Sequence, residues 1–269
     1  MLSLTKVVLR MKTPALSTAS HRVTNEKIFS LIEKNITPDS QILDLGSGSG
    51  YMTRKIFNWL QEHGQNSIGK ITASDINRDA FKATEIDFVE ADFGNKLPFD
   101  DHSFDLVFSV EVIEHLTNPY NFIEECKRVL KPGGTLILST PNINNLQSKL
   151  RYLLTGMHAL YEAPSVKPEN AGRLCGHIMP LGLVYIAYAL RRAGLLNIQI
   201  HGDKPKKSSV ILYYALYPIL KMSQSWQRAH SLRYDVSTFE ENKELMASNS
   251  SFASLTSRST ILEAQTPLA

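Results

Sequence analysis

The stretch QILDLGSGSGYMTRKIF, residues 41–57, decides the fold. An apolar run that contains one acid, Asp44, leads into three glycines at alternate positions, Gly46, Gly48 and Gly50. Glycine adopts positive φ without steric cost and lets the backbone approach a ligand closely. A strand, a glycine turn and a helix in succession are typical of a nucleotide-binding α/β domain, although the third glycine comes one residue earlier than in the dinucleotide pattern G-x-G-x-x-G.

The chain around this stretch alternates short apolar runs with helical periods, which predicts an α/β domain built on a mainly parallel sheet. The expected strands are 41–45, 70–74, 87–91, 104–110, 135–139, 195–200 and 259–264. The expected helices are 25–35, 50–62, 78–84, one that Asn118 caps and Pro119 opens, and 180–193.

Composition sets the broad class of protein. The chain has 269 residues, of which 43% are hydrophobic and 20% charged, as in a globular protein with a sizeable core. A net charge of +3 is too small to indicate nucleic acid. The two cysteines, Cys126 and Cys175, form neither a disulfide framework nor a zinc spacing. We therefore expect no nucleic-acid partner, a reducing compartment and a cytoplasmic location.

Acids stand at or near the ends of the first three expected strands. Asp75 can accept hydrogen bonds from both ribose hydroxyls, and Asp92 can accept one from the adenine amine. Asp44 would be unfavourable beside a pyrophosphate but stabilising beside an ammonium group. The structural alternative for each acid is a helix cap or a solvated loop end. Taken together, the acids favour a ligand that carries adenosine and an amine, which S-adenosylmethionine does and NAD does not.

The motifs DLGSGSG, SDIN, EADFGNKLPFDDHSFDLVFSVEVIEHL and ECKRVLKPGGTLILSTPN resemble the class I S-adenosylmethionine-dependent methyltransferases. The resemblance covers about residues 25–142 and, less firmly, 170–202. It implies a Rossmann-like seven-stranded sheet of order 3-2-1-4-5-7-6, with helices on both faces and an antiparallel seventh strand. By position it also implies the residues that bind S-adenosylmethionine: Asp44, Gly46, Ser47, Gly48, Gly50, Asp75, Ile76, Asp92, Phe93 and Val110.

This resemblance divides the chain. The methyltransferase domain is expected at 25–202, with a cover segment at 141–179 that is too long for a simple connection. An insertion with an apolar helix follows at 203–258, and the last strand and tail at 259–269. Residues 1–24 are a basic lead, for which a transit peptide, an amphipathic segment and a plain tail all stay open. A transit peptide would place a eukaryotic protein in mitochondria.

The acceptor side offers four titratable residues. Glu111, Glu114 and His115 lie in SVEVIEHL, and His177 lies in CGHIMPL, within the cover. We take His115, Glu111 and His177 as the catalytic candidates, because an imidazole has a pKa suited to base work. The E-x-x-E-H spacing resembles the same stretch in ubiquinone-biosynthesis O-methyltransferases. A divalent ion at Glu111, Glu114 and His115 is one alternative and a structural role is another; no metal is the expectation.

The expected function is transfer of a methyl group from S-adenosylmethionine to a small-molecule, lipid-linked or glycan acceptor, on oxygen. The alternative is a non-catalytic subunit that binds S-adenosylmethionine.

The segment 208–221 is the most apolar part of the chain, and Pro218 interrupts it. It is too short to span a bilayer. Cations flank it on both sides: Lys204, Lys206, Lys207, Lys221, Arg228 and Arg233. This pattern is typical of an element that lies in a membrane interface. A peripheral membrane surface through 204–221 and a helix packed within the protein or against a second subunit both stay open.

Overall fold

A seven-stranded sheet forms the centre of the molecule. The computed structural model describes residues 20–37, 39–63, 69–170 and 173–268. The strands are β1 (Ile42–Leu45), β2 (Ile71–Asp75), β3 (Asp87–Glu90), β4 (Phe104–Val110), β5 (Leu130–Pro141), β6 (Leu196–Gly202) and β7 (Ser259–Gln265). Their order is β3-β2-β1-β4-β5-β7-β6. β7 runs antiparallel to both β5 and β6, so the predicted order and the reversed seventh strand are confirmed.

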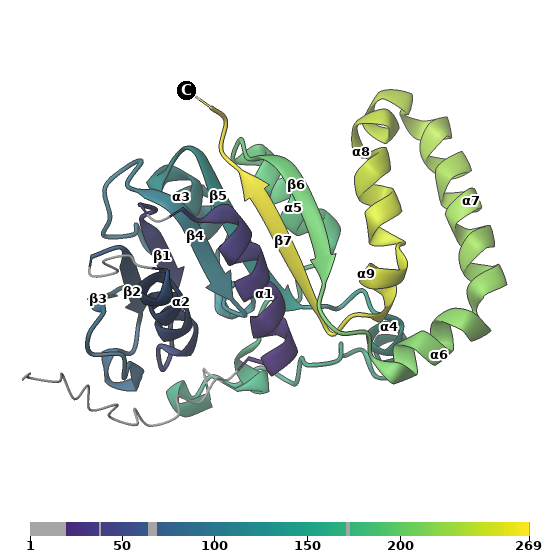
Figure 1. Cartoon of the computed structure of the whole chain (residues 1–269). Helices are drawn as coiled ribbons and strands as arrows, with labels where there is room; N and C mark the ends of the chain where they lie inside the picture. The colour runs from purple at the N-terminus through teal and green to yellow at the C-terminus, as the bar shows by residue number, and fades with distance from the viewer. Residues whose placement is uncertain (1–19, 38, 64–68, 171–172, 269) are drawn as a thin grey trace, which may run out of the picture.

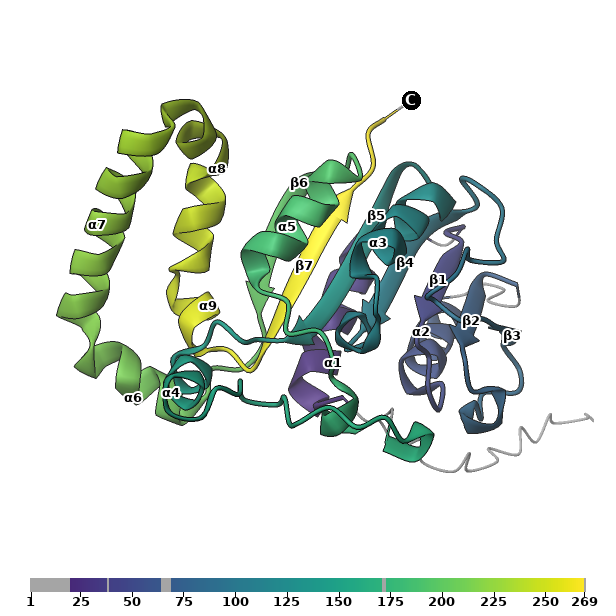
Figure 2. The same cartoon turned by 180° about the vertical axis from the view of Figure 1, so that it is seen from behind.

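Helices cover both faces of the sheet, as predicted (Figures 1 and 2). The α-helices are α1 (Arg22–Asn35), α2 (Tyr51–Glu62), α3 (Pro119–Val129), α4 (Leu146–Thr155), α5 (Leu183–Arg192), α6 (Lys207–Ala215), α7 (Tyr217–Tyr234), α8 (Val236–Asn249) and α9 (Phe252–Thr256). Single 3-10 turns are η1 (Arg78–Ala80), η2 (Ile113–His115), η3 (Pro168–Asn170) and η4 (Leu174–Gly176). α1 and α2 lie on one face, and α3 and α5 on the other.

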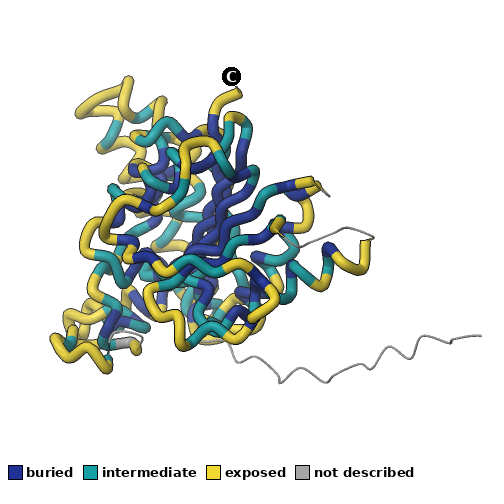
Figure 3. The backbone as a smooth tube through the Cα atoms, turned by 90° about the vertical axis from the view of Figure 1, so that its left-hand side faces the viewer, coloured by how far each residue is buried: buried dark blue, intermediate teal, exposed yellow. Residues whose placement is uncertain are grey.

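The core divides into one apolar layer on each face. Successive residues of a strand point to opposite faces, so Ile42 packs in the layer under α1 and α2, whereas Leu43 packs in the layer under α3 and α5. Figure 3 shows the buried residues gathered along the strands in the middle of the molecule and the exposed residues around the periphery. Cys126 of α3 belongs to this core.

Local sequence signals explain where α3 begins and ends. The Asn118 side chain accepts a hydrogen bond from the Asn121 backbone N–H, and Pro119 is the first helical residue. The last turn carries Lys127 and Arg128, whose positive charges are stabilised by the negative end of the helix dipole. The predicted start of this helix is confirmed.

Two predicted helices are shorter in the structure. The expected helix 78–84 is wrong beyond one turn, because only Arg78–Ala80 is helical. The chain then passes beside the glycine turn, where the Lys82 N–H donates to the Ser49 carbonyl at 3.1 Å. The last domain helix begins at Leu183 rather than at Pro180, since Gly182 takes the cap position with extended backbone.

The cover and the insertion contain helices of their own. The 141–179 cover holds α4, η3 and η4, and 203–258 holds α6 to α9. The two ends of this insertion meet at an isolated bridge between Pro205 and Ser257. Within it α7 and α8 form a hairpin beside the sheet (Figure 1). Residues 1–19 of the basic lead lie outside the described residues.

Candidate functional site

The glycine turn after β1 has the backbone that only glycine adopts easily. Gly46, Gly48 and Gly50 have φ of 89°, 50° and 84°. A Cβ on Gly46 would stand 2.2 Å from Cγ2 of Val112, and one on Gly50 would stand 2.8 Å from the Phe81 ring. A Cβ on Gly48 meets nothing within 4 Å. The outer two glycines therefore permit close packing, and the middle one faces open space.

Asp44 lies buried beneath this turn. Its side chain is 2% exposed and accepts a hydrogen bond from the Thr53 hydroxyl of α2. Burial, helped by the nearby charge of Asp75 and opposed by the Thr53 hydrogen bond, raises the pKa of Asp44 to about 7. A buried carboxyl with this pKa gains from an adjacent cation, because the cation stabilises its ionised form.

Two further groups of the turn bear on ligand binding. Asp75 accepts hydrogen bonds from the backbone N–H of Gly48 (2.8 Å) and of Asn77 (3.0 Å). Each carboxylate oxygen has capacity for a second donor, such as a hydroxyl. The Ser47 hydroxyl is buried without a hydrogen-bond partner among the described residues. An orphaned buried hydroxyl of this kind fits a polar ligand group, which would satisfy it.

The remaining predicted cofactor residues follow β2, β3 and β4. Ile76 is 65% exposed beside Asp75, so its apolar side chain is available to a flat ring. Asp92 is exposed and accepts from the Gly94 N–H at 2.9 Å. Phe93 is buried, and its ring packs against Phe122 with centroids 5.8 Å apart. The Phe93 ring is therefore part of the core, and only its backbone is left to meet a ligand. Val110, at the end of β4, is half-buried.

A second group of polar side chains follows β4. Glu114 of η2 is fully buried, and its Oε2 accepts a hydrogen bond from the Thr140 hydroxyl at 3.1 Å. Its other oxygen, Oε1, has no partner among the described residues. Burial, together with the charge of Glu111, raises the pKa of Glu114 to about 8. Glu114 is thus a carboxyl that holds its proton near neutral pH.

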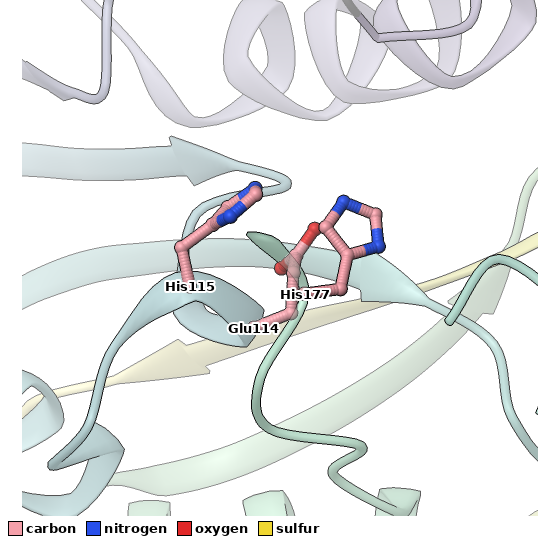
Figure 4. A group of neighbouring side chains, drawn as sticks. All are labelled: Glu114, His115 and His177. Carbon is pink, nitrogen blue, oxygen red and sulfur yellow. The ribbon is translucent and has the colours of Figure 1, made fainter. Parts of the chain in front are cut away.

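The cover docks on η2 through its backbone. The N–H groups of Ile178 and Met179 both donate to the Glu114 carbonyl at 3.0 Å. Nδ1 of His115 lies 2.9 Å from the carbonyl oxygen of Gly176. These contacts bring His177 beside His115, with the rings edge to face and their centroids 4.7 Å apart. Figure 4 shows the two imidazoles and the Glu114 carboxyl gathered at this contact.

The hydrogen bond of His177 fixes its tautomer. Its Nδ1 lies 2.7 Å from the Leu160 carbonyl oxygen, and a carbonyl only accepts, so Nδ1 carries the proton. Burial lowers the pKa of His177, which makes the imidazole neutral at neutral pH. The lone pair of Nε2 is therefore the basic position of this ring.

The predicted metal ligands do not all come together. One ligand atom each of Glu114, His115 and His177 lies within 4.8 Å of the others. Glu111 instead accepts from Arg258 at 3.0 Å and from the Ser259 hydroxyl at 2.8 Å. The cluster in the structure therefore contains His177 in place of Glu111, which the sequence pattern had grouped with Glu114 and His115. Sequence reasoning also missed Arg258 and Thr140; the polar end of β5 was a signal for Thr140, whereas nothing in the sequence marked Arg258.

Comparisons with known proteins agree with this geometry. Residues 43–138 match the methyltransferase domain family. The chain is 34% identical to a ubiquinone/menaquinone biosynthesis C-methyltransferase of Pseudomonas savastanoi pv. phaseolicola over 50% of this chain and 54% of the relative. It is 37% identical to cycloartenol-C-24-methyltransferase 1 of Oryza sativa subsp. japonica over 39% of this chain and 31% of the relative. The chain thus spans about half the length, or less, of these curated relatives.

The fold agrees as well. A solved S-adenosylmethionine-dependent methyltransferase from Archaeoglobus fulgidus superposes with a TM-score of 0.53 at 14% identity, over 90% of this chain and 94% of the other. The sheet order and the glycine turn are those of the class I S-adenosylmethionine-dependent methyltransferase fold, and residues 43–138 match the methyltransferase domain family. The chain's relatives by sequence include proteins named as a C-methyltransferase of ubiquinone/menaquinone biosynthesis and as a cycloartenol C-24-methyltransferase.

Proposed function

We propose that the protein transfers a methyl group from S-adenosylmethionine to a hydroxyl of an apolar, lipid-linked small molecule. One observation carries the proposal. At the glycine turn, the space beside the Gly48 backbone is open, and the buried Ser47 hydroxyl has no hydrogen-bond partner among the described residues. The carboxyls of Asp44 and Asp75 lie at the same turn. This set fits a ligand with an ammonium group and a ribose, and it does not fit a pyrophosphate.

S-adenosylmethionine supplies a methyl group on a positively charged sulfur, which a nucleophile displaces. The chain's own residues hold that molecule. Asp44 and the glycine turn are assigned to its amino-acid part, and Asp75 to the ribose hydroxyls. Ile76, Asp92 and the backbone of Phe93 are assigned to the adenine side, and Val110 is assigned a position beneath the donor. Positioning of donor and acceptor supplies much of the rate enhancement in such a displacement.

The acceptor hydroxyl must lose a proton as it is methylated. His177 is neutral, and its Nε2 lone pair is directed away from the Leu160 carbonyl that fixes the ring. We assign proton acceptance to His177 with His115 as its neighbour in edge-to-face contact. Glu111 acts as a positioning residue, because Arg258 and Ser259 already bind its carboxylate.

The acceptor class rests on two supports. The relatives named above are named for C-methylation in ubiquinone/menaquinone biosynthesis and of cycloartenol, and a further relative is named as a ubiquinone biosynthesis O-methyltransferase; ubiquinone, menaquinone and cycloartenol are all apolar molecules. In addition, exposed apolar side chains of α4 and α6 lie at the end of the sheet where the parallel strands have their carboxyl ends (Figures 1 and 2). An apolar acceptor suits such surroundings better than a free sugar does.

The test has a binding step and a transfer step. Calorimetry with S-adenosylhomocysteine measures binding, and NAD serves as the negative control. Transfer is then measured as S-adenosylhomocysteine release with prenylated phenols, sterols and their unprenylated counterparts, and the methylated atom is identified by mass spectrometry. Carbon methylation would correct the acceptor atom. Equal binding of NAD, or no binding at all, would refute the proposal.

The histidines need their own variants. His177→Ala should reduce transfer by about 10²- to 10⁴-fold, as expected for loss of a general base, with unchanged affinity for S-adenosylhomocysteine. His63→Ala, an exposed histidine after α2, is the matched control. Full activity of both His177→Ala and His115→Ala would remove the base assignment. Tight cofactor binding without transfer to any acceptor would favour the alternative, a non-catalytic subunit.

A divalent ion is the second candidate for the same cluster. The observation that favours it is the approach of Glu114, His115 and His177 within 4.8 Å, with Glu114 Oε1 unsatisfied among the described residues. If an ion acts there, a chelator abolishes transfer and a divalent cation restores it. Transfer that survives exhaustive chelation assigns the cluster to proton movement alone.

A further inference from the structure

Helix α7 stands out because none of its 18 residues is buried. Three apolar side chains recur on it at helical spacing, Ile219, Met222 and Trp226, with exposed fractions of 61%, 73% and 68%. Residues three and four apart share one helix face, so these side chains form a continuous outward stripe. Gln224, on the inner face, donates to the Ser250 carbonyl at 3.3 Å and ties α7 to the end of α8.

Two neighbouring helices also carry exposed apolar side chains. α6 adds Ile211 (70% exposed) and Tyr214 (68%), and α4 adds Leu153 (78%) and Leu154 (73%). α4 and α6 are held together through the Ser209 hydroxyl, which accepts from the Gln147 N–H at 3.2 Å and donates to the Asn145 side chain at 3.2 Å. We call these seven apolar side chains of α4, α6 and α7 the apolar rim.

The segment that carries α6 and α7 has charges of one sign. Residues 204–234 contain no Asp or Glu, and they contain the cations Lys204, Lys206, Lys207, Lys221, Arg228 and Arg233. α8, the other arm of the hairpin, carries the acids Glu240, Glu241 and Glu244. Lys221 and Arg228 share the inner face of α7 with Gln224 and line a hollow beside Glu240 of α8. The cations left for the outer side are Lys204 and Lys207, at the start of α6, and Arg233, which lies on the Trp226 face of α7.

These features distinguish between the surfaces that could cover the rim. In a two-fold dimer the same patch meets itself, so α6 and α7 of each copy would bring cations against cations. An anionic lipid surface instead complements the cations and accepts the exposed apolar side chains. Among the described residues, no helix is both long and apolar enough to cross a membrane. α6 and α7 therefore fit helices that lie in the interface of a membrane without crossing it.

We propose that the apolar rim docks on an anionic lipid bilayer, with α6 and α7 lying along the headgroup region. Ile219, Met222 and Trp226 enter the interface, and the flanking cations bind acidic headgroups. α4 and α6 also lie at the end of the molecule that holds the glycine turn (Figures 1 and 2). The docking is independent of the proposed methyl transfer, and its test requires neither cofactor nor acceptor.

Trp226 provides a direct readout. The chain has two tryptophans, and the other, Trp59, bonds to Glu33 on α1. In a Trp59→Phe background, the fluorescence of Trp226 should shift to the blue on addition of vesicles of phosphatidylcholine and phosphatidylglycerol. The protein should also cosediment with these vesicles. Both effects should weaken with added salt and with phosphatidylcholine alone, because salt screens the headgroup attraction.

Matched variants separate the charges from the apolar stripe. Changing Lys204, Lys207 and Arg233 together to Ala should lower the vesicle partition coefficient about 100-fold, since each cation near an anionic surface contributes about fivefold. Changing Lys34, Lys127 and Arg192 to Ala removes the same charge elsewhere and should leave partition unchanged. The Ile219→Ser, Met222→Ser variant should also lose partition but keep its salt dependence.

Two outcomes would overturn the proposal. One is a folded protein, by circular dichroism, that stays in the supernatant with anionic vesicles at low salt. The other is a blue shift of Trp226 that rises with protein concentration in the absence of lipid, together with a doubled mass in sedimentation. That second result would assign the rim to a second copy of the chain.

Discussion

Arg258 and Glu111 join two distant parts of the chain: the Arg258 guanidinium, just before β7, lies 3.0 Å from the Glu111 carboxylate, just after β4. Glu111 also has a φ of 53°, a left-handed backbone that is uncommon for this residue type. Its side chain is 12% exposed, so loss of Arg258 would leave a carboxylate with little water around it. The pair therefore holds the turn after β4 in place.

Arg258→Leu should lower the free energy of unfolding by about 1–3 kcal/mol, less than for a fully buried pair because both side chains keep some solvent contact. The double variant Arg258→Leu, Glu111→Gln should recover part of the loss, because no unpaired charge remains. Urea unfolding of the four proteins in this cycle measures the coupling. Strictly additive losses would show that the pair contributes nothing.

Asp44 should make cofactor affinity depend on pH. Its pKa is about 7, so the ionised form that pairs with an ammonium group rises steeply from pH 6 to pH 8. Affinity for S-adenosylhomocysteine should therefore increase about tenfold over this range. Asp44→Asn should bind more weakly and lose this dependence. Calorimetry at each pH makes the comparison, and an unchanged profile in Asp44→Asn would assign the titration to another group.

Asp75→Ala should weaken S-adenosylhomocysteine binding by about 1–3 kcal/mol, because the ribose hydroxyls and the Gly48 N–H lose a carboxylate acceptor. Asp79→Ala, in the exposed turn η1, is the matched control and should bind as the wild type does. If both variants bind equally, Asp75 has no contact with the ligand.

Glu114 should make stability depend on pH in a known direction. Its folded-state pKa is about 8 and its ordinary value is 4.5, so the folded protein holds a proton that the unfolded chain releases. The contribution of Glu114 to stability is then greatest at low pH and declines as pH rises from about 4.5 to 8.

Glu114→Gln removes this titration while it keeps the shape of the side chain. Its melting temperature relative to wild type should therefore improve between pH 5 and pH 9. Glu244→Gln, an exposed position on α8, serves as the control. A difference in melting temperature that is the same at both pH values would mean that Glu114 is ionised in the folded protein throughout.

The sequence carried strong signals for the sheet and weaker ones for the acceptor side. The glycine turn, the acids near strand ends and the Asn118-Pro119 helix start are local patterns, and their positions follow from short-range sterics and capping. The expected helix 78–84 failed because Phe81 and Ala83 pack against Gly50, a tertiary contact that outweighs local propensity.

The grouping of His177 with Glu114 could not be read from the sequence. It depends on how the cover folds back, and that is decided by backbone hydrogen bonds from Ile178 and Met179 to Glu114. Backbone groups are the same in every residue and leave no compositional trace. For the same reason Arg258 gave no signal: its partner, Glu111, lies far away along the chain and is brought near only by the placement of β7.

The position of β7 also bears on how the molecule assembles. β7 pairs with β5 and β6 on its two sides, yet it follows all of the insertion helices in the chain. β5 and β6 never pair with each other, so until β7 docks β5 has one open edge and β6 has no partner strand. The half of the sheet made by β3, β2, β1 and β4 needs only nearer contacts, so it can form during synthesis while the other half waits for the loop from Pro141 to Ser259 to close. We therefore expect the docking of β7 to be the slow step of folding. Aggregation should be most frequent before β7 docks, because strand edges are still unpaired during that time.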